Sequence, residues 1–323
     1  MKKQYKLIIS LLVMLLLVST FTLADVQAKG KKASKSSVSY TLKNGTLTVK
    51  GKGAIPGDMT FKNNKKIKKV VIKKGITEIP DDAFYGCKNL KSVKLPSTLK
   101  TIGSYAFYNT SIQNLTIPKS VETIGMSAFK AYGKNKTIAK VKMPGKFKTK
   151  VEEREETDLS TASVYARNIE FTTAIDPQIF ASVNAEFYKV SKKDKNYSSK
   201  DGIIYNKDFT ETVLLPNRKK VEIDSRCTTF DIRSAIIGDV SHGKYYLRNN
   251  KIKEIVLPSS VTKIVNTEKN IDMDDMIFAE STYNIKKIVI QNPDIEEESY
   301  NLLKTTFYGL KEKKTKKMIV LSR

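Results

Sequence analysis

The sequence is poor in the residues that carry most catalytic and metal chemistry. Its 323 residues include one histidine (His242), two cysteines (Cys87 and Cys227) and no tryptophan. A zinc site built from His and Cys would need nearly every such residue in the chain, and two cysteines cannot hold together a small disulfide-dense fold. The motifs His-Glu-x-x-His, Gly-x-Ser-x-Gly and Gly-x-x-x-x-Gly-Lys-Ser/Thr are also missing. We therefore expect no enzymatic activity and no cofactor.

The few residues with catalytic potential are more simply explained as loop or core residues. His242 lies in Ser-His-Gly without a partnered nucleophile beside it, which favours a loop residue. A Cys227–His242 dyad, or a disulfide between Cys87 and Cys227, would require the fold to bring residues together that the sequence keeps apart. We interpret Cys87 as a small buried hydrophobe.

Two acidic clusters could in principle bind a cation. Asp272, Asp274 and Asp275 lie close together, and Asp194 is followed by Asn196 and Ser198. Neither cluster has the glycine and loop spacing of a known calcium site. We expect no metal site, and the sequence leaves cation binding by Asp272, Asp274 and Asp275 open.

Only one long hydrophobic run occurs. Lysines at 2, 3 and 6 precede the apolar stretch 7–18, and Val26-Gln27-Ala28 offers small residues for cleavage. This plan is typical of a secretory signal peptide over residues 1–28. The alternative is an uncleaved anchor, since 7–23 is at the lower limit of a membrane span. No second run has this length, so we expect a secreted or cell-surface protein without a membrane span after cleavage.

A repeat organises the remaining chain. Ala-Phe recurs at 83, 106 and 128, and a Leu-Pro or Ile-Pro step recurs at 95 and 117. A period of 20 to 29 residues around an L-x-x-L-x-L core indicates leucine-rich repeats. Six clear windows begin at Ile67, Leu90, Ile112, Ile138, Ile252 and Ile285, and weaker ones begin at Ala166, Ala185 and Thr315.

The letters of one repeat predict its local structure. In Val93-Lys94-Leu95 the alternation places the apolar residues inward and the lysine outward, and the following proline ends the strand. Residues 97–103 then turn the chain, with Gly103 at a tight corner, and Phe107 fills the core. Because Cys87 and Thr110 occupy the same slot of the repeat, that slot should be narrow and buried.

The pattern Ile-Gly-x-x-Ala-Phe, then Leu-x-x-Val-x-Leu-Pro, resembles the BspA-type leucine-rich repeats of bacterial surface and secreted proteins. The resemblance is specific over residues 38–144, patchy over 145–250 and recovers over 252–290. It implies a leucine-rich repeat solenoid of the β-rich α/β class, with a parallel sheet on one face and short turns and little regular helix on the other. It also implies adhesion or host interaction.

The expected organisation follows the repeats. It consists of a signal peptide (1–28), a flexible basic arm (29–37), N-terminal capping strands (38–75) with a hairpin at Asn44-Gly45, regular repeats (76–145), degenerate repeats with an interruption hairpin (146–250), and C-terminal repeats with a cap (251–323). Within the last part we expect a helix over 296–310 and a strand over 318–321.

Charge is unevenly distributed. Residues 29–150 hold 27 lysines, no arginine and 5 acidic residues, whereas residues 151–323 hold 28 basic and 27 acidic residues. Nine lysines occupy outward positions of the six windows, which predicts a basic sheet face as a tentative ligand-binding surface. These are Lys68, Lys69, Lys91, Lys94, Lys140, Lys142, Lys253, Lys286 and Lys287. If the repeats stack regularly, these lysines share one sheet face on strands about 4.8 Å apart, which is inside the screening length of about 8 Å at physiological salt, so they would repel one another.

The leading hypothesis is therefore a non-enzymatic, exported or cell-surface binding protein whose partner is a protein or an anionic glycan or wall polymer. Nucleic acid is disfavoured, because the basic half lacks arginine, the usual reader of base edges. The alternatives are a structural envelope protein held electrostatically to the producer's own wall polymers, an enzyme with an unrecognised site, and lysines that merely keep a surface solvated. The sequence does not define the ligand or the oligomeric state.

Overall fold

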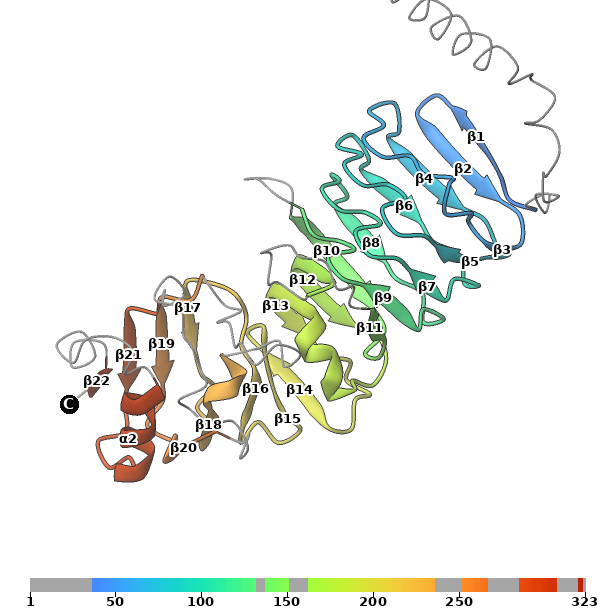
Figure 1. Cartoon of the computed structure of the whole chain (residues 1–323). Coiled ribbons are helices and arrows are strands. Elements are labelled where there is room, and N and C mark those ends of the chain that lie inside the picture. The colour runs from blue at the N-terminus through green and yellow to red at the C-terminus, as the bar shows by residue number, and fades with distance from the viewer. Residues whose placement is uncertain are drawn as a thin grey trace, which may run out of the picture. The chain divides into compact units, whose positions relative to one another are not determined.

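Each repeat forms one coil, and the coils stack through parallel strands (Figure 1). The computed structural model describes residues 37–131, 137–150, 162–235, 251–266, 285–306 and 319–321. An eight-stranded sheet has the order β1-β2-β4-β6-β8-β10-β12-β13. Its strands are β1 (Ser39–Lys43), β2 (Thr46–Lys50), β4 (Lys69–Ile72), β6 (Ser92–Lys94), β8 (Asn114–Thr116), β10 (Ile138–Met143), β12 (Val164–Phe171) and β13 (Val183–Lys189). The predicted leucine-rich repeat fold class is confirmed.

The first two strands form the hairpin expected at Asn44-Gly45. β1 runs antiparallel to β2, with Lys43 opposite Thr46. Both turn residues have positive φ, 50° at Asn44 and 77° at Gly45, as a two-residue turn between twisted strands requires. All other neighbours in this sheet are parallel.

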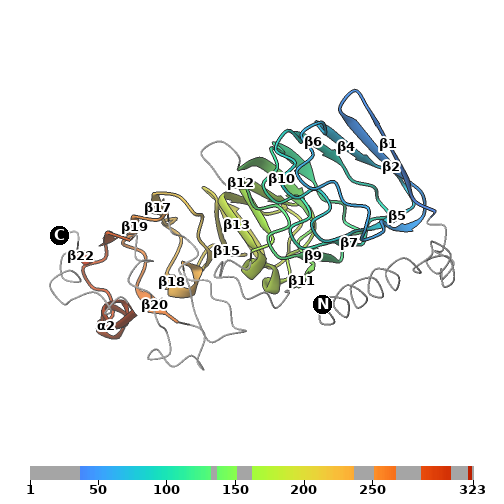
Figure 2. The same cartoon turned by 45° about the horizontal axis from the view of Figure 1, so that its top comes forward.

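The opposite side of the coils carries a second parallel sheet, which the sequence analysis did not foresee. It has the order β11-β9-β7-β5-β3, and Figure 2 shows its strands beneath the larger sheet. The strands are β3 (Gly53–Ala54), β5 (Ile76–Ile79), β7 (Thr101–Ile102), β9 (Thr123–Gly125) and β11 (Lys148–Lys150). The segment around 99–103 was assigned to a turn, but its backbone groups find partners at the same phase of adjacent coils and so form a short strand.

A column of phenylalanines runs through the core of the first coils. Phe61, Phe84, Phe107 and Phe129 stack nearly parallel, with ring centroids 5.5, 5.1 and 5.2 Å apart. The column begins at Phe61, one coil before the first Ala-Phe pair of the sequence pattern. Tyr40 meets Phe61 edge-on at 4.9 Å. Phe84 and Phe107 therefore each pack against the rings of the coils before and after their own.

Glycine permits the close contact between coils. A Cβ added at Gly103 would lie 2.4 Å from the backbone nitrogen of Asp81, and one at Gly125 would lie 2.2 Å from that of Ser104. The sequence analysis assigned Gly103 to a tight corner. The structure gives a different reason, because the backbone of the preceding coil leaves no room for a side chain at this position.

An antiparallel three-stranded sheet interrupts the stack, as the hairpin predicted within residues 146–250 suggested. It consists of β14 (Tyr197–Lys200), β15 (Ile203–Asn206) and β16 (Thr212–Leu214). Side chains alternate along β15, so that Ile203 and Tyr205 join one hydrophobic core and Ile204 joins the other. This sheet therefore separates two cores and contributes to both.

The second core lies within a smaller stack. Its sheets are β17 (Lys220–Glu222), β19 (Glu254–Leu257), β21 (Lys287–Ile290) and β22 (Ile319–Leu321), and β18 (Thr229–Asp231) with β20 (Lys263–Val265). The 3-10 turn η1 (Pro177–Ser182) lies between β12 and β13, and the 3-10 turn η2 (Ile232–Ser234) follows β18. The helix expected over 296–310 is confirmed as α2 (Glu297–Thr306), and the terminal strand as β22.

Several predictions concern parts of the chain outside the described residues. These parts are the signal peptide (1–28), the basic arm apart from Ser37, His242, and the cluster Asp272, Asp274 and Asp275. In the part that the structure describes, no helix is long and apolar enough to cross a membrane.

The phenylalanine column makes a stability prediction. Phe107 is 1% exposed, whereas Phe187 is 38% exposed. Phe107→Ala should lower the free energy of unfolding by about 3–5 kcal/mol, because the cavity lies between two stacked rings. Phe187→Ala serves as the matched control and should cost about 1 kcal/mol. Urea denaturation measures both free energies of unfolding, and equal losses in the two variants would contradict a stabilising role of the stacked rings.

Candidate functional site: a lysine-rimmed groove

The larger sheet has one weak seam. Three residue pairs join β4 to β6 and three join β8 to β10, but β6 and β8 are matched only where Ser92 lies opposite Asn114. The strands therefore separate beyond this pair. Inward-facing residues next to the seam, Val93 and Leu95, are only partly buried although they pack against the core.

A groove of about 540 Å³ lies along this seam, and we call it the β6–β8 groove. Its apolar lining comes from Val93, Leu95, Leu115 and Pro118, and its polar lining from Ser97, Asn114, Thr116, Lys94, Lys140 and Lys142. The three lysines belong to the nine predicted from the sequence. The groove thus combines an apolar floor with three ammonium groups on its rim.

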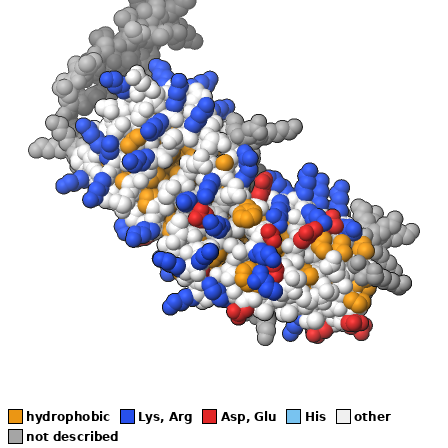
Figure 3. All heavy atoms as spheres, turned by 180° about the vertical axis from the view of Figure 1, so that it is seen from behind, with side chains coloured by type: hydrophobic (Ala, Val, Ile, Leu, Met, Phe, Trp, Pro, Cys, Tyr) orange, Lys and Arg blue, Asp and Glu red, His pale blue; other side chains and the backbone are white. Residues whose placement is uncertain are grey.

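All nine predicted lysines are exposed. Figure 3 shows one face of the molecule, on which basic side chains are spread widely with hydrophobic side chains between them. Lysines therefore cover much of this surface, and exposure alone does not distinguish the β6–β8 groove from the rest.

The register spaces the lysines of the larger sheet apart. Lys69 lies opposite Ser92, and Lys140 lies between Asn114 and Asn168. The expectation that these lysines would be direct neighbours across strands is wrong for the paired positions of β4 to β10, because serine, asparagine and threonine occupy the intervening strands. The repulsion between the ammonium groups is correspondingly smaller.

Glu170 on β12 partly balances the groove. Its carboxylate lies 3.0 Å from Nζ of Lys140 and 4.0 Å from Nζ of Lys142. The hydrogen bond from Lys140 lowers the pKa of Glu170, which keeps it ionised. Sequence reasoning missed this residue because it lies in the weak window at 166–171. Within the described residues Lys94 has no such partner.

The remaining predicted lysines lie at other places. Lys68 and Lys91 occupy the same position on neighbouring coils, since the amide of Lys91 donates to the carbonyl of Lys68 at 3.0 Å. In the second stack the amide of Lys253 donates to Lys219, and that of Lys286 to Lys253, at 2.8 and 2.7 Å. The structure therefore divides the nine lysines between the two stacks.

Lys219, Lys253 and Lys286 form a row of lysines on the second stack, and Lys219 was not among the lysines predicted from the sequence. Lys219-Lys220 precedes Val221 as Lys286-Lys287 precedes Ile288, and this echo was the available signal. Acidic residues neutralise part of this surface. Lys220 pairs with Glu222 at 2.5 Å, and Lys287 lies 3.8 Å from Glu254.

Asp194, one candidate for cation binding, instead accepts hydrogen bonds from the local backbone. Its carboxylate accepts from the amides of Ile175, Asn196 and Tyr197 at 2.8 to 2.9 Å. Three N–H donors aimed at the carboxylate occupy it and repel a cation. Among the described residues no group of three or more His, Cys, Asp or Glu side chains could hold a metal ion.

The two cysteines are free and buried, so they do not form a disulfide with each other. The Cys87 thiol donates to the carbonyl of Phe61 at 3.0 Å, and the hydroxyl of Thr110 donates to that of Phe107 at 3.0 Å. The structure therefore confirms the narrow, buried repeat slot that Cys87 and Thr110 were expected to share.

Comparisons with known proteins agree with the repeat geometry. Residues 55–186 match the family model described as the BspA type leucine rich repeat region, in six copies. Residues 55–186 therefore consist of leucine-rich repeats of the BspA type. The match extends past residue 145 through β12 and into β13, where the sequence pattern was patchy. No curated protein matches the chain.

Three solved structures are similar to this chain and its BspA-type repeats. A leucine-rich repeat protein from Eubacterium ventriosum has 18% identity and a TM-score of 0.42, over 89% of this chain and 83% of that one. A leucine-rich cell surface protein from Faecalibacterium prausnitzii has 17% identity and a TM-score of 0.32, over 89% and 93%. The pneumococcal vaccine antigen PcpA has 14% identity and a TM-score of 0.32, over 89% and 97%.

The buried thiols make a prediction about pH. Burial raises the pKa of Cys227 from 9.0 to about 11, so the folded state retains the thiol proton longer than the unfolded state does. The stabilising contribution is complete below pH 9 and is lost as pH rises toward 11. Cys227→Ala should therefore reduce the loss of stability over that interval.

Urea denaturation between pH 8 and pH 11 measures this effect, with the exposed Ser225→Ala as control. An unchanged pH profile in Cys227→Ala would contradict a buried, protonated thiol.

Proposed function

We propose that this protein is an exported, non-enzymatic binding protein that holds an anionic polymer of a cell surface in the β6–β8 groove. The observation that carries the proposal is the conjunction of an opened strand seam, an apolar floor and three lysines in one groove of about 540 Å³. A solvated lysine surface needs none of these features except the lysines.

The chemistry of the groove favours an anion that also has apolar groups. Lys94, Lys140 and Lys142 supply positive charge, while Val93 and Leu115 supply a surface for carbon chains or sugar faces. Asn114 and Thr116 lie between them and can hydrogen-bond hydroxyl or phosphate oxygens. A phosphate-bearing polyol or glycan polymer satisfies all three kinds of contact.

Export and the absence of catalysis belong to the proposal as well. The signal-peptide pattern at residues 1–28 and the surface location that BspA-type repeats imply support an extracellular site of action, with adhesion as its purpose. Both thiols of the described residues bond to backbone carbonyls, Cys87 to that of Phe61 and Cys227 to that of Thr229.

The remaining predicted lysines would act as a diffuse positive field. Lys68, Lys69 and Lys91 precede the groove along the sheet, and Lys253, Lys286 and Lys287 lie on the second stack. Fields of this kind raise the association rate more than the affinity. We therefore assign retention of the polymer to the groove and its attraction to the whole surface.

Replacement of Lys94, Lys140 and Lys142 with Gln should weaken binding of soluble poly(glycerol phosphate) about ten-fold. Exposed ion pairs contribute about 0.2–1 kcal/mol each, and about 1.4 kcal/mol corresponds to a factor of ten. Isothermal titration calorimetry at low and high salt measures the change, and wild-type binding should fall with salt because screening shortens.

The matched control replaces Lys192, Lys193 and Lys195 with Gln, which removes the same charge from an exposed loop. An equal loss in both triple variants would show that net charge alone matters and would reject the groove. Equal binding of neutral dextran and poly(glycerol phosphate) would reject the anionic partner.

A further inference from the structure

A second ladder of backbone hydrogen bonds links the coils beside the phenylalanine column. The amide of each phenylalanine donates to the next coil, from Phe61 to Ala83, from Phe84 to Ala106 and from Phe107 to Ala128, at 2.7 to 2.8 Å. The residue two positions later does the same, from Asn63 to Tyr85, from Gly86 to Tyr108 and from Asn109 to Lys130. Each coil thus accepts two bonds from the coil before it.

Among the described residues, no coil precedes the first one to complete this ladder. Its equivalent acceptors are the carbonyls of Thr60 and Lys62, 23 residues before Ala83 and Tyr85. Among the described residues no amide donates to either carbonyl. The end of a stack whose backbone carbonyls have no donor can accept hydrogen bonds from another polypeptide.

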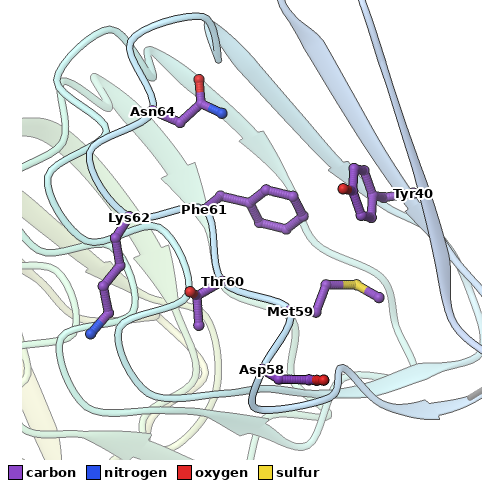
Figure 4. Close-up of a pocket in the computed structure, with 7 residues that line it drawn as sticks. All are labelled: Tyr40, Asp58, Met59, Thr60, Phe61, Lys62 and Asn64. Atoms are coloured by element: carbon purple, nitrogen blue, oxygen red, sulfur yellow. The ribbon is translucent and has the colours of Figure 1, made fainter. Parts of the chain in front are cut away.

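A pocket of about 480 Å³ lies at this same end, lined by Tyr40, Asp58, Met59, Thr60, Phe61, Lys62 and Asn64. In Figure 4 the side chains of Tyr40, Met59 and Phe61 gather on one side, while Lys62 points away from them. Tyr40 is 51% exposed although it lies edge-on to Phe61. The pocket has a mainly polar lining, in which three apolar side chains, those of Tyr40, Met59 and Phe61, form a recess beside the carbonyls of Thr60 and Lys62.

The reason for the recess is the topology of the first coil. Tyr40 lies opposite Val49 in the hairpin, and Val49 is fully buried in the core. Tyr40 therefore faces the core side of its sheet, but the second sheet ends at β3 and places no strand opposite β1. One half-coil is missing from the sandwich at this point.

Charge identifies the occupant. Residues 38–66 contain six lysines and one acidic residue, Asp58, which lines the pocket, and one of the six lysines, Lys62, is paired with Asp82 at 3.0 Å. A second copy would bring the same basic end against this one, and residues 29–36 of the chain itself contain four lysines. Both would meet like charge, whereas an acidic peptide would meet opposite charge.

We propose that this end of the first stack is a docking site for an extended, acidic polypeptide segment of a partner protein. Two of its amides, two residues apart, donate to the carbonyls of Thr60 and Lys62. An aromatic or aliphatic side chain beside them enters the recess between Tyr40, Met59 and Phe61. This site is independent of the β6–β8 groove and of its polymer.

Fluorescence anisotropy with a labelled synthetic peptide, acetyl-Glu-Asp-Phe-Asp-Ile-Asp-Glu-amide, tests the proposal on the exported chain. Met59→Gln should weaken binding about ten-fold, because it puts an amide against the apolar side chain of the peptide. The control Val320→Ser changes an equally peripheral apolar residue, 37% exposed on β22, and should change the affinity less than two-fold. N-methylation of the Phe and Ile amides of the peptide should weaken binding at least ten-fold.

Several outcomes would overturn the inference. They are no measurable binding, an equal loss in Val320→Ser, or unchanged affinity for the N-methylated peptide. The variant with Lys94, Lys140 and Lys142 replaced by Gln separates this site from the proposed function. It should bind the peptide normally, and a ten-fold loss there would place the peptide in the β6–β8 groove instead.

Discussion

The structure depends on a constant phase between successive coils, which means that equivalent residues of each repeat lie next to one another in adjacent coils. Backbone hydrogen bonds join each coil to its neighbours in two sheets and in the ladder beside the phenylalanine column. These bonds form only if each coil places the same groups at the same height, so the side chains of equivalent positions also stack. The rings of Phe61 to Phe129, the glycines at 103 and 125, and the buried slot of Cys87 and Thr110 all follow from this constraint.

We propose that a partner binds where this phase is lost. Where β6 and β8 are matched at a single pair, inward-facing side chains reach the surface and the β6–β8 groove opens. Where the first coil has no predecessor, carbonyls and a recess stay available. Regular coils satisfy their own backbone groups and bury their own apolar residues, and so they present mainly lysines to a partner.

The sequence predicted the features of the fold that follow from local sequence patterns. Ala-Phe pairs and Leu-Pro steps at fixed intervals predicted the parallel stack. Alternation in Val93-Lys94-Leu95 predicted the inward residues, and Asn44-Gly45 predicted the capping hairpin. The sequence could not reveal the second sheet, because a two-residue strand such as Thr101–Ile102 has no alternation of its own and exists only through its neighbours. It also missed Glu170 and Lys219, since their relation to the predicted lysines depends on the register between strands. The separation of β6 from β8 has no signal in either strand.

Hydrogen–deuterium exchange of the chain without residues 1–28, with and without poly(glycerol phosphate), tests most directly whether loss of phase creates the proposed binding site. We predict that amides of β6 and β8 exchange faster than those of β2 and β4 in the free protein, because they have fewer partners across the seam. Addition of the polymer should slow exchange chiefly in β6, β8 and β10. Uniform exchange along the larger sheet, or protection that appears only in the second stack, would contradict the account.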